Sequence, residues 1–298
     1  MILIVGATGM LGGRITRRLL AAGEDVRILV RHNSSSAEMA KIGMATSAQS
    51  LIDAGAQPVY GDLKDSATLD AACVGVDTLI TTANSVLRGG EDTPETVDHQ
   101  GNLNLIDAAK AAGVKHFIFT SALGADPDNS IPLLRYKAAA ETALQESGMT
   151  YTILSPNLIA EVWFGAVVGA PLQARQPVTL VGEARRKHSF VGMDDVAAFA
   201  VAAVDKPAAS NVSFSVCGPE AISWRDVVVQ VEEVVGQEVP VRFAQPGEPI
   251  PFVPEAVQQS LAMQDTYDSP LSMGFIATLY GVTLTPVAAV VQGMFGGH

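Results

Sequence analysis

The first half of the chain alternates short apolar, β-branched runs with longer amphipathic runs, and this alternation constrains the fold more than any other feature. The short runs predict strands over residues 2–5, 25–30, 57–60, 77–82, 116–120 and 150–154. The longer runs predict helices over residues 9–22, 36–54, 66–73, 93–112 and 133–147. Parallel strands need a crossover of about a dozen residues, so the pattern predicts an α/β fold with a doubly wound parallel sheet of the Rossmann type.

The regular alternation stops after residue 155. Glycines and prolines between residues 165 and 182 interrupt the periodicity, and a helix (194–204), a strand (212–216), a helix (224–235) and a strand (239–243) are then expected. We predict a Rossmann domain over residues 1–155, with residues 189–217 returning to its sheet. Residues 156–188 and 218–298 form a smaller, irregular part, expected to bind substrate at the carboxyl edge of the sheet.

Charge and cysteine content exclude several classes of protein. The chain has 19 Lys and Arg against 31 Asp and Glu, a formal charge of -12, which disfavours nucleic-acid binding. Its two cysteines, Cys73 and Cys217, lie far apart in apolar segments and are expected to be buried, reduced thiols. No metal site is expected. The apolar run over residues 1–5 lacks a basic region before it, so a cytoplasmic location is predicted.

The C-terminal stretch from residue 269 to residue 297 contains no charged residue and is long enough to raise the question of a membrane span. Glycines, threonines and Pro286 divide it into short pieces, and no basic residues flank it. We therefore expect packed C-terminal helices and no integral membrane span. These helices are also a candidate surface for a protein partner, or a lid over the substrate.

A glycine-rich turn joins the first strand to the first helix. Its sequence, Gly6-Ala7-Thr8-Gly9-Met10-Leu11-Gly12, has three glycines at three-residue spacing. Such a turn lets the backbone approach a pyrophosphate, and the helix N-terminus supplies free N–H groups. The position between a strand and a helix therefore predicts that this turn binds a dinucleotide.

The end of the second strand selects the nucleotide. An acid here would bind the ribose hydroxyls of NAD, but the chain has Arg31, followed by His32, Asn33 and three serines. A guanidinium suits a 2′-phosphate, so the predicted cofactor is NADP(H). The alternative is a solvated basic loop.

Further candidate cofactor residues follow the third and fourth strands. Asp62 is a candidate partner for the adenine amino group, with Leu63 against the ring. Alternatively, Asp62 caps the helix that begins near Ser66. The small residues Thr82, Ala83 and Asn84 leave room for the ribose and nicotinamide.

Together these segments resemble the short-chain dehydrogenase/reductase superfamily, and within it the NmrA-like and isoflavone-reductase-like branch. The matching residues are Gly6, Gly9 and Gly12, Arg31, Gly61-Asp62-Leu63, the run from Val97-Asp98 through Asn102 to Gly113-Val114, Phe117, Ser121, Lys137 with Glu141, and Phe190-Val191 with Asp194-Asp195-Val196-Ala197. The resemblance covers most of the chain. It implies an NAD(P)-binding oxidoreductase and is weak for the substrate.

The resemblance implies that Lys137 is the active lysine, while the family's usual Tyr four residues upstream is replaced by Leu133. Tyr136 cannot replace it, because one step along a helix turns a side chain by about 100°. The isoflavone-reductase-like branch also lacks this Tyr and uses the Lys as general acid/base. Lys137 is thus either a proton donor or only an anchor for the ribose hydroxyls.

Four other side chains are candidate substrate contacts. Ser121 either hydrogen-bonds a substrate oxygen or caps a turn, and His188 lies in the irregular part near the expected cleft. Trp163 and Phe164 either wall a pocket for an aromatic substrate or pack in the core. The resulting hypothesis is an NADPH-dependent reductase of an apolar conjugated acceptor, such as a quinone, enone or phenolic heterocycle. The alternative is a non-catalytic NADP-binding redox sensor or assembly factor.

Overall fold

The computed structural model describes residues 1–32, 45–86, 88–250, 253 and 255–297. The described residues form two compact units. Unit 1 comprises Met1–Pro156 and Val196–Ser215, and unit 2 comprises Asn157–Asp195 and Val216–His298. The segment that returns to unit 1 is therefore residues 196–215, inside the range of 189–217 expected from the sequence.

Unit 1 is built on a seven-stranded sheet of order β3-β2-β1-β4-β5-β6-β8. The strands are β1 (Ile2–Val5), β2 (Val26–Val30), β3 (Gln57–Tyr60), β4 (Thr78–Thr81), β5 (His116–Thr120), β6 (Thr150–Pro156) and β8 (Val212–Val216). From β3 to β6, all neighbouring strands pair in parallel. This confirms the predicted Rossmann-type α/β sheet, with the chain reversing its strand order between β1 and β4.

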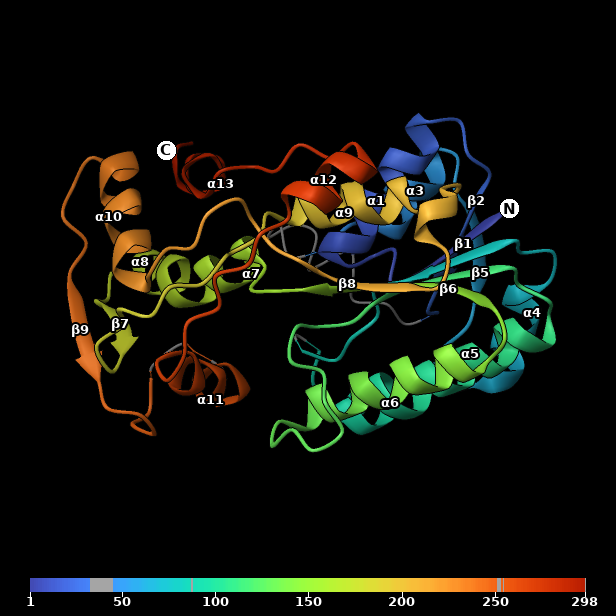
Figure 1. The fold of residues 1–298 in the computed structure, drawn as a ribbon, viewed down its shortest axis with the longest axis horizontal. Coiled ribbons are helices and arrows are strands. Elements are labelled where there is room, and N and C mark those ends of the chain that lie inside the picture. Colours follow the sequence, from blue (N-terminus) through green and yellow to red (C-terminus); the bar gives the residue numbers. More distant parts are fainter. Residues whose placement is uncertain (33–44, 87, 251–252, 254, 298) are drawn as a thin grey trace. The chain divides into compact units, whose positions relative to one another are not determined.

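Helices cover both faces of this sheet (Figure 1). They are α1 (Met10–Ala21), α3 (Ala48–Asp53), α4 (Ser66–Cys73), η1 (Pro94–Gly101), α5 (Asn102–Ala111), α6 (Pro132–Glu146), α9 (Met193–Ala202) and the short η3 (Pro207–Ala209). One face carries α4, α5 and α6, and the other carries α1 and α3 (Figure 1). The helix expected over 93–112 is instead a π-helical turn, η1, that continues into α5. Residues 36–44 of the helix expected over 36–54 lie outside the described residues.

The sheet is apolar on both faces, as expected for parallel strands covered by helices on each side. Every residue of β1 is buried, and Leu79 and Phe117 of the neighbouring strands belong to one continuous core. Cys73 and Cys217 are both free and buried, as expected for two buried thiols. Burial raises the pKa of each thiol to about 11, because a thiolate loses its hydration there.

Unit 2 contains a second, two-stranded sheet in which β7 (Val178–Val181) pairs in parallel with β9 (Val241–Ala244). Its helices are α7 (Ala160–Phe164), η2 (Gly165–Gly169), α8 (Ala170–Gln173), α10 (Trp224–Val235), α11 (Glu255–Gln264), α12 (Gly274–Tyr280) and α13 (Val287–Phe295). Strand β7 was not expected from the sequence, and β9 begins two residues later than the strand expected at 239.

The glycines read as interruptions in this region are part of a helical run instead. Gly165 and Gly169 begin and end the π-helical turn η2 between α7 and α8. Glycine normally weakens a helix. Here Val167 and Val168, between the two glycines, are buried in the core of unit 2, so tertiary packing outweighs local propensity.

The uncharged C-terminal stretch forms α12 and α13, in agreement with the expectation of short packed helices. Val287, Val290 and Val291 of α13 belong to the core of unit 2, together with Trp224 and Val228 of α10. No helix in the described part of the chain is long and apolar enough to cross a membrane.

We predict that Val291→Asp destabilises the protein by about 3 kcal/mol or more, because an unpaired carboxylate would be buried among apolar side chains. Ala289→Asp is the matched control, since Ala289 lies on the exposed side of the same helix. Denaturant unfolding of the two variants measures the difference. Equal unfolding free energies for both would show that α13 is not a core helix.

Candidate functional site

The parallel register gathers the predicted cofactor residues at one edge of the sheet. Gly6, Arg31, Gly61, Thr82 and Ser121 are each the first residue after a strand. The strand ends are level, since Val5 pairs with Thr81 and Val30 with Tyr60. Because the carboxyl ends of parallel strands meet at the same edge, loops distant in sequence converge there.

The glycine turn is closed tightly on itself. Gly6 has φ +87°, and the Gly9 N–H donates to the Gly6 carbonyl at 2.9 Å. A Cβ on Gly12 would collide with the Gly6 carbonyl oxygen, so this position requires glycine. Helix α1 then begins at Met10 with no capping side chain and no acid in its first turn. This turn suits a pyrophosphate, which binds backbone N–H groups at a helix N-terminus.

Other residues predicted to bind the cofactor pack or hydrogen-bond around the glycine turn. Leu11 is buried, and the Thr8 carbonyl accepts a hydrogen bond from the Thr46 N–H at 2.8 Å. On the neighbouring strand, the Thr82 N–H donates to Val5 and its hydroxyl donates to Gly6 at 3.4 Å. These contacts hold the end of β4 against the glycine turn.

Arg31 contacts a carboxylate at this edge. Its Nη1 donates to Asp92 at 2.5 Å, and Lys64 Nζ reaches the other oxygen of Asp92 at the same distance. Arg88 lies 3.6 Å from Asp92. Three cations from the ends of β2, β3 and β4 thus surround one acid, an arrangement that fits an anion-binding site. The sequence analysis identified Arg31 alone, although Lys64 follows Asp62-Leu63 directly.

Asp62 does not cap helix α4, because the N-cap of that helix is Asp65. The carboxylate of Asp62 instead accepts a hydrogen bond from the Lys64 N–H at 2.9 Å and remains one-third exposed. Leu63 is buried in the core of unit 1. The proposed contact of these two residues with adenine stays a prediction.

Lys137 is a buried cation at the same edge, 4% exposed. Its Nζ donates to the Thr120 carbonyl at 3.1 Å and to the Ala83 carbonyl at 3.4 Å. It also lies 4.8 Å above the ring of Phe119. Burial lowers the pKa of Lys137, and the charge of Asp98 partly offsets this effect.

Asp98 is the acid that the sequence analysis did not single out as functional. It is fully buried on η1, and its Oδ1 lies 3.6 Å from Lys137 Nζ. Its Oδ2 accepts hydrogen bonds from the Ser85 N–H at 3.0 Å and the Ser85 hydroxyl at 2.6 Å. Its position in the family motif could have revealed it, since a buried carboxylate needs a partner.

Two residues that contact Lys137 each have a buried side-chain oxygen without a hydrogen-bond partner among the described residues: Asp98 Oδ1 and Thr120 Oγ1. Buried polar atoms are normally hydrogen-bonded, so unpaired ones mark a place where a ligand can complete the network. Hydroxyl groups of a ribose have the required chemistry. Together with the glycine turn and the three cations, these atoms fit a dinucleotide phosphate.

Ser121 and Glu141 form a second polar pair near Lys137. The Ser121 hydroxyl donates to Glu141 Oε1 in a very short hydrogen bond. Burial raises the pKa of Glu141, and the hydrogen bond from Ser121 and the charge of Lys137 oppose this rise. Ser121 is therefore held by a side chain of α6 and does not cap a turn through this bond. Its contact with substrate stays a prediction.

Tyr136 occupies a different environment from its neighbour Lys137. Its ring stacks on His99, with centroids 4.8 Å apart, and a hydrogen bond to Glu95 raises its pKa. This geometry agrees with the expectation that Tyr136 does not replace the missing family tyrosine.

The predicted substrate contacts in unit 2 are largely core residues. Phe164 is fully buried and packs against Phe190 and Trp224. His188 is 1% exposed, with its ring nitrogens near Ser269 Oγ at 2.8 Å and the Gln264 carbonyl at 3.2 Å. Phe164 is therefore placed as the core-packing alternative expected, and the contact of His188 with substrate stays a prediction. Trp163 is half-buried, and its role stays a prediction.

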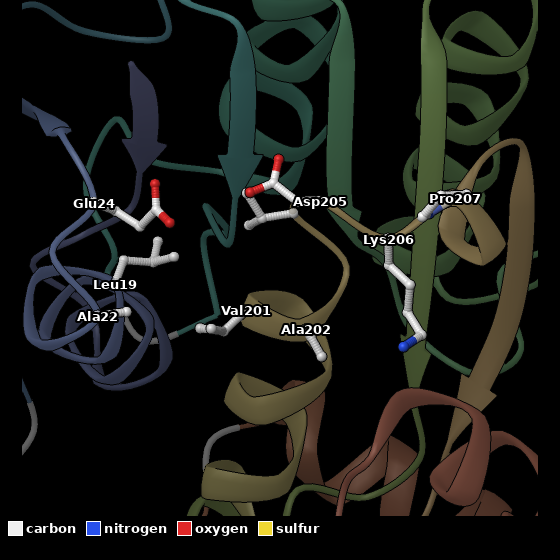
Figure 2. A pocket seen from close by; sticks show the side chains of 9 residues that line it. Leu19, Ala22, Glu24, Val201, Ala202, Asp205, Lys206 and Pro207 are labelled. Atoms are coloured by element: carbon white, nitrogen blue, oxygen red, sulfur yellow. The ribbon is translucent and has the colours of Figure 1, made fainter.

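A pocket of about 370 Å³ lies in unit 1 away from these groups (Figure 2). It is lined by the C-terminal ends of α1 and α9 and by the segment after α9, including Glu24, Asp205 and Lys206. Helix α1 starts at the glycine turn and runs about 18 Å from it. The pocket is therefore at the opposite edge of the sheet from Lys137.

Comparison with known proteins identifies the family. Residues 1–270 match the model of the NmrA-like family. The chain belongs to the NmrA-like family. Among proteins similar to it, an NAD(P)H azoreductase of Xenophilus azovorans is 32% identical over 245 residues, which are 82% of this chain and 76% of that protein. The photosystem II assembly factor Ycf39 of Trieres chinensis is 30% identical over 243 residues, 80% of this chain and 70% of that protein.

A solved structure shares the fold along the whole length. The triphenylmethane reductase of Citrobacter sp., complexed with NADP(H), superposes with a TM-score of 0.77 at 22% identity, covering 98% of this chain and 99% of that one. The predicted NADP(H) cofactor and the resemblance to NmrA-like oxidoreductases agree with these relatives. In the described residues, no cluster of three or more His, Cys, Asp or Glu side chains is placed to hold a metal.

We predict that Arg31→Ala weakens NADPH binding by about 1.5–3 kcal/mol, the range for a hydrogen bond to a charged group, and leaves NADH binding nearly unchanged. The reason is that only NADPH carries a 2′-phosphate for the guanidinium. Fluorescence titration of both nucleotides against both proteins measures the difference. Identical NADPH and NADH titration curves for the wild type would contradict the role of Arg31.

Proposed function

We propose that this protein is an NADPH-dependent reductase that transfers reducing equivalents to an apolar, conjugated acceptor. The single observation that carries the proposal is Lys137, a buried lysine beside Asp98 at the sheet edge where the glycine turn and the cationic cluster also lie. A structural lysine would ordinarily extend to solvent. Burial of its ammonium group is therefore best explained by chemistry at this position.

The cofactor fits the residues present, with each part assigned to one group of side chains. The turn at Gly6, Gly9 and Gly12 would hold the pyrophosphate, and Arg31 the 2′-phosphate. Lys137 and Thr120 would hold the nicotinamide ribose. When bound, the reduced nicotinamide supplies a hydride to the acceptor.

The protein's own task is then to handle the proton. Reduction of a carbonyl or quinone oxygen requires one proton for each hydride that is added. Lys137 Nζ is the proton donor in the proposed mechanism, and its pKa, lowered by burial, makes release of the proton easier than from an exposed lysine. Asp98 orients the ammonium group and keeps it charged between turnovers. Ser121 orients the acceptor oxygen when its hydroxyl turns from Glu141 to donate to that oxygen.

The relatives guide the choice of acceptor. One is an azoreductase, and a protein of the same fold is a triphenylmethane reductase. Both names refer to extended conjugated molecules, the class that the sequence analysis expected in quinones, enones and phenolic heterocycles. We therefore propose a conjugated acceptor and include an azo dye in the test panel. The two free, buried thiols support a reducing compartment such as the cytoplasm.

A second function is supported by other observations. The chain lacks the family tyrosine, and its relatives include photosystem II assembly factors. On α12, Phe275 and Leu279 are four residues apart and are 78% and 39% exposed, so one helix face presents apolar side chains. A non-catalytic NADP(H)-binding protein that acts on a protein partner through its C-terminal helices is the alternative.

We predict that Lys137→Met lowers turnover of the acceptor panel by roughly 10²-fold, the lower end for loss of a general acid, while NADPH affinity falls only modestly. Lys110→Met is the matched control, because Lys110 is exposed on α5 and should leave turnover unchanged. Steady-state oxidation of NADPH with each acceptor measures the effect. If NADPH affinity and turnover fell by the same factor, Lys137 would only anchor the ribose hydroxyls of the cofactor.

The same assay separates the two functions. Acceptor-dependent NADPH oxidation by the wild type, lost in Lys137→Met, would eliminate the non-catalytic alternative. If the wild type binds NADPH but oxidises it with no acceptor in the panel, the reductase proposal fails. A difference in protease sensitivity between the NADPH and NADP⁺ complexes would then support the sensor.

Asp98→Asn tests whether Asp98 acts through Lys137. The charge of Asp98 raises the pKa of Lys137 against the effect of burial, so its removal lowers that pKa further. If protonated Lys137 is required, activity falls as pH rises through this pKa, and the fall should occur at lower pH in Asp98→Asn. Profiles of kcat against pH measure the shift. A uniform loss of activity at every pH would indicate a purely structural role.

A further inference from the structure

We infer that the carboxylate of Asp92 occupies the 2′-phosphate site when no cofactor is bound. The 2′-phosphate of NADPH must displace this carboxylate or bind against its negative charge, so Asp92 reduces the preference for NADPH over NADH. The inference rests on the proposed binding of NADP(H), but not on turnover of any substrate. It concerns Asp92, Lys64 and Arg88, none of which the sequence analysis assigned to the site.

The geometry of the cluster carries the inference. Asp92 Oδ2 accepts a hydrogen bond from Arg31 at 2.5 Å, and Asp92 Oδ1 accepts one from Lys64 at 2.5 Å. Both carboxylate oxygens are thus used by cations from two different loops. Arg88 adds a third cation, 3.6 Å from Oδ2. Arg31 follows β2 directly, at the position where an incoming 2′-phosphate needs its guanidinium.

Burial distinguishes Asp92 from an ordinary surface acid. Its side chain is 10% exposed, whereas the side chains of Arg31, Lys64 and Arg88 are each about 30% exposed. The acid therefore lies inside the ring of cations that it neutralises. Burial alone would raise the pKa of Asp92, but the hydrogen bonds from Lys64 and Arg31 outweigh it and lower the pKa. The carboxylate is consequently charged at neutral pH.

A carboxylate and a phosphate compete for the same donors. Both present negatively charged oxygens to a guanidinium and an ammonium group, with charge-assisted hydrogen bonds of similar geometry. Three cations face two acids here, because Asp62 also lies 3.4 Å from Lys64. A 2′-phosphate adds up to two further negative charges, which makes the cluster net negative as long as Asp92 stays in place.

The backbone before Asp92 allows its carboxylate to move out of the site. Asp92 follows the Gly89-Gly90 turn, in which both glycines have positive φ values of +87° and +63° and no atom lies where a Cβ would be. A bridge between Gly89 and Asp92 closes this turn. Two consecutive unhindered glycines have a wide range of accessible conformations, so a small backbone change can withdraw the carboxylate.

The experiment compares binding of two nucleotide fragments to Asp92→Asn. The fragment 2′,5′-ADP carries the 2′-phosphate, whereas 5′-AMP lacks it but has the same adenosine. We expect Asp92→Asn to bind 2′,5′-ADP about tenfold more tightly than the wild type does, the scale of one charge-assisted hydrogen bond, with 5′-AMP unchanged. The affinity for NADPH should rise as that for 2′,5′-ADP does, and the affinity for NADH should stay unchanged, as that for 5′-AMP does. Isothermal titration calorimetry measures all four.

Asp70→Asn is the matched control, because it removes one negative charge from an exposed position of α4 in the same unit. It should change neither fragment's affinity. Thermal unfolding of each variant, with and without 2′,5′-ADP, confirms that the protein titrated is folded. It also provides an independent measure of binding.

Three results would overturn the inference. Weaker 2′,5′-ADP binding by Asp92→Asn would make Asp92 an organiser of the cations, and weaker binding of 5′-AMP and NADH alone would make it a ribose ligand. Unchanged affinity for 2′,5′-ADP would show that Asp92 does not affect the choice between NADPH and NADH. In these cases the proposed function survives, because the wild type binds NADPH. Failure of the wild type to bind any nucleotide would overturn the proposed function together with this inference.

Discussion

The common edge of the parallel sheet is the constraint on which the site depends. Six strands run in the same direction with level ends, so that loops from widely separated parts of the sequence meet there. The glycine turn, Arg31, Ser121 and the carbonyl groups that receive Lys137 are all consequences of this one arrangement. The site is assembled where strands joined by backbone hydrogen bonds end together.

Charge at this edge is distributed between two centres that differ in burial. The cluster of Arg31, Lys64 and Arg88 around Asp92 is partly exposed, so it can exchange partners with an incoming anion. The pair of Lys137 and Asp98 is buried, so both ions have lost most of their hydration. The first centre therefore suits recognition of a charged group, and the second suits proton chemistry.

Much of unit 1 could be predicted from the sequence, because strands buried on both faces appear as continuous apolar runs and their loops begin with diagnostic residues. Lys137 was identifiable from its family motif. Its partner Asp98 belongs to the same set of family-matching residues but was not singled out, since an acid on an amphipathic helix usually faces solvent. Unit 2 was harder. Local breakers at Gly165 and Gly169 suggested loops, whereas packing against a large apolar core stabilises a helix there.

The π-helical turn η1 has a consequence for how this site can change during evolution. A π-helical turn contains about one residue more than an α-helical turn, and it lies between the start of the helix and the packed segment α5. Deletion of a single residue between Asp98 and α5 would rotate Asp98 by about 100° relative to α5. The packing of α5 would survive. An indel, without any substitution of Lys137 or Asp98, would thus separate the two residues and leave an intact nucleotide-binding domain that has lost its buried ion pair.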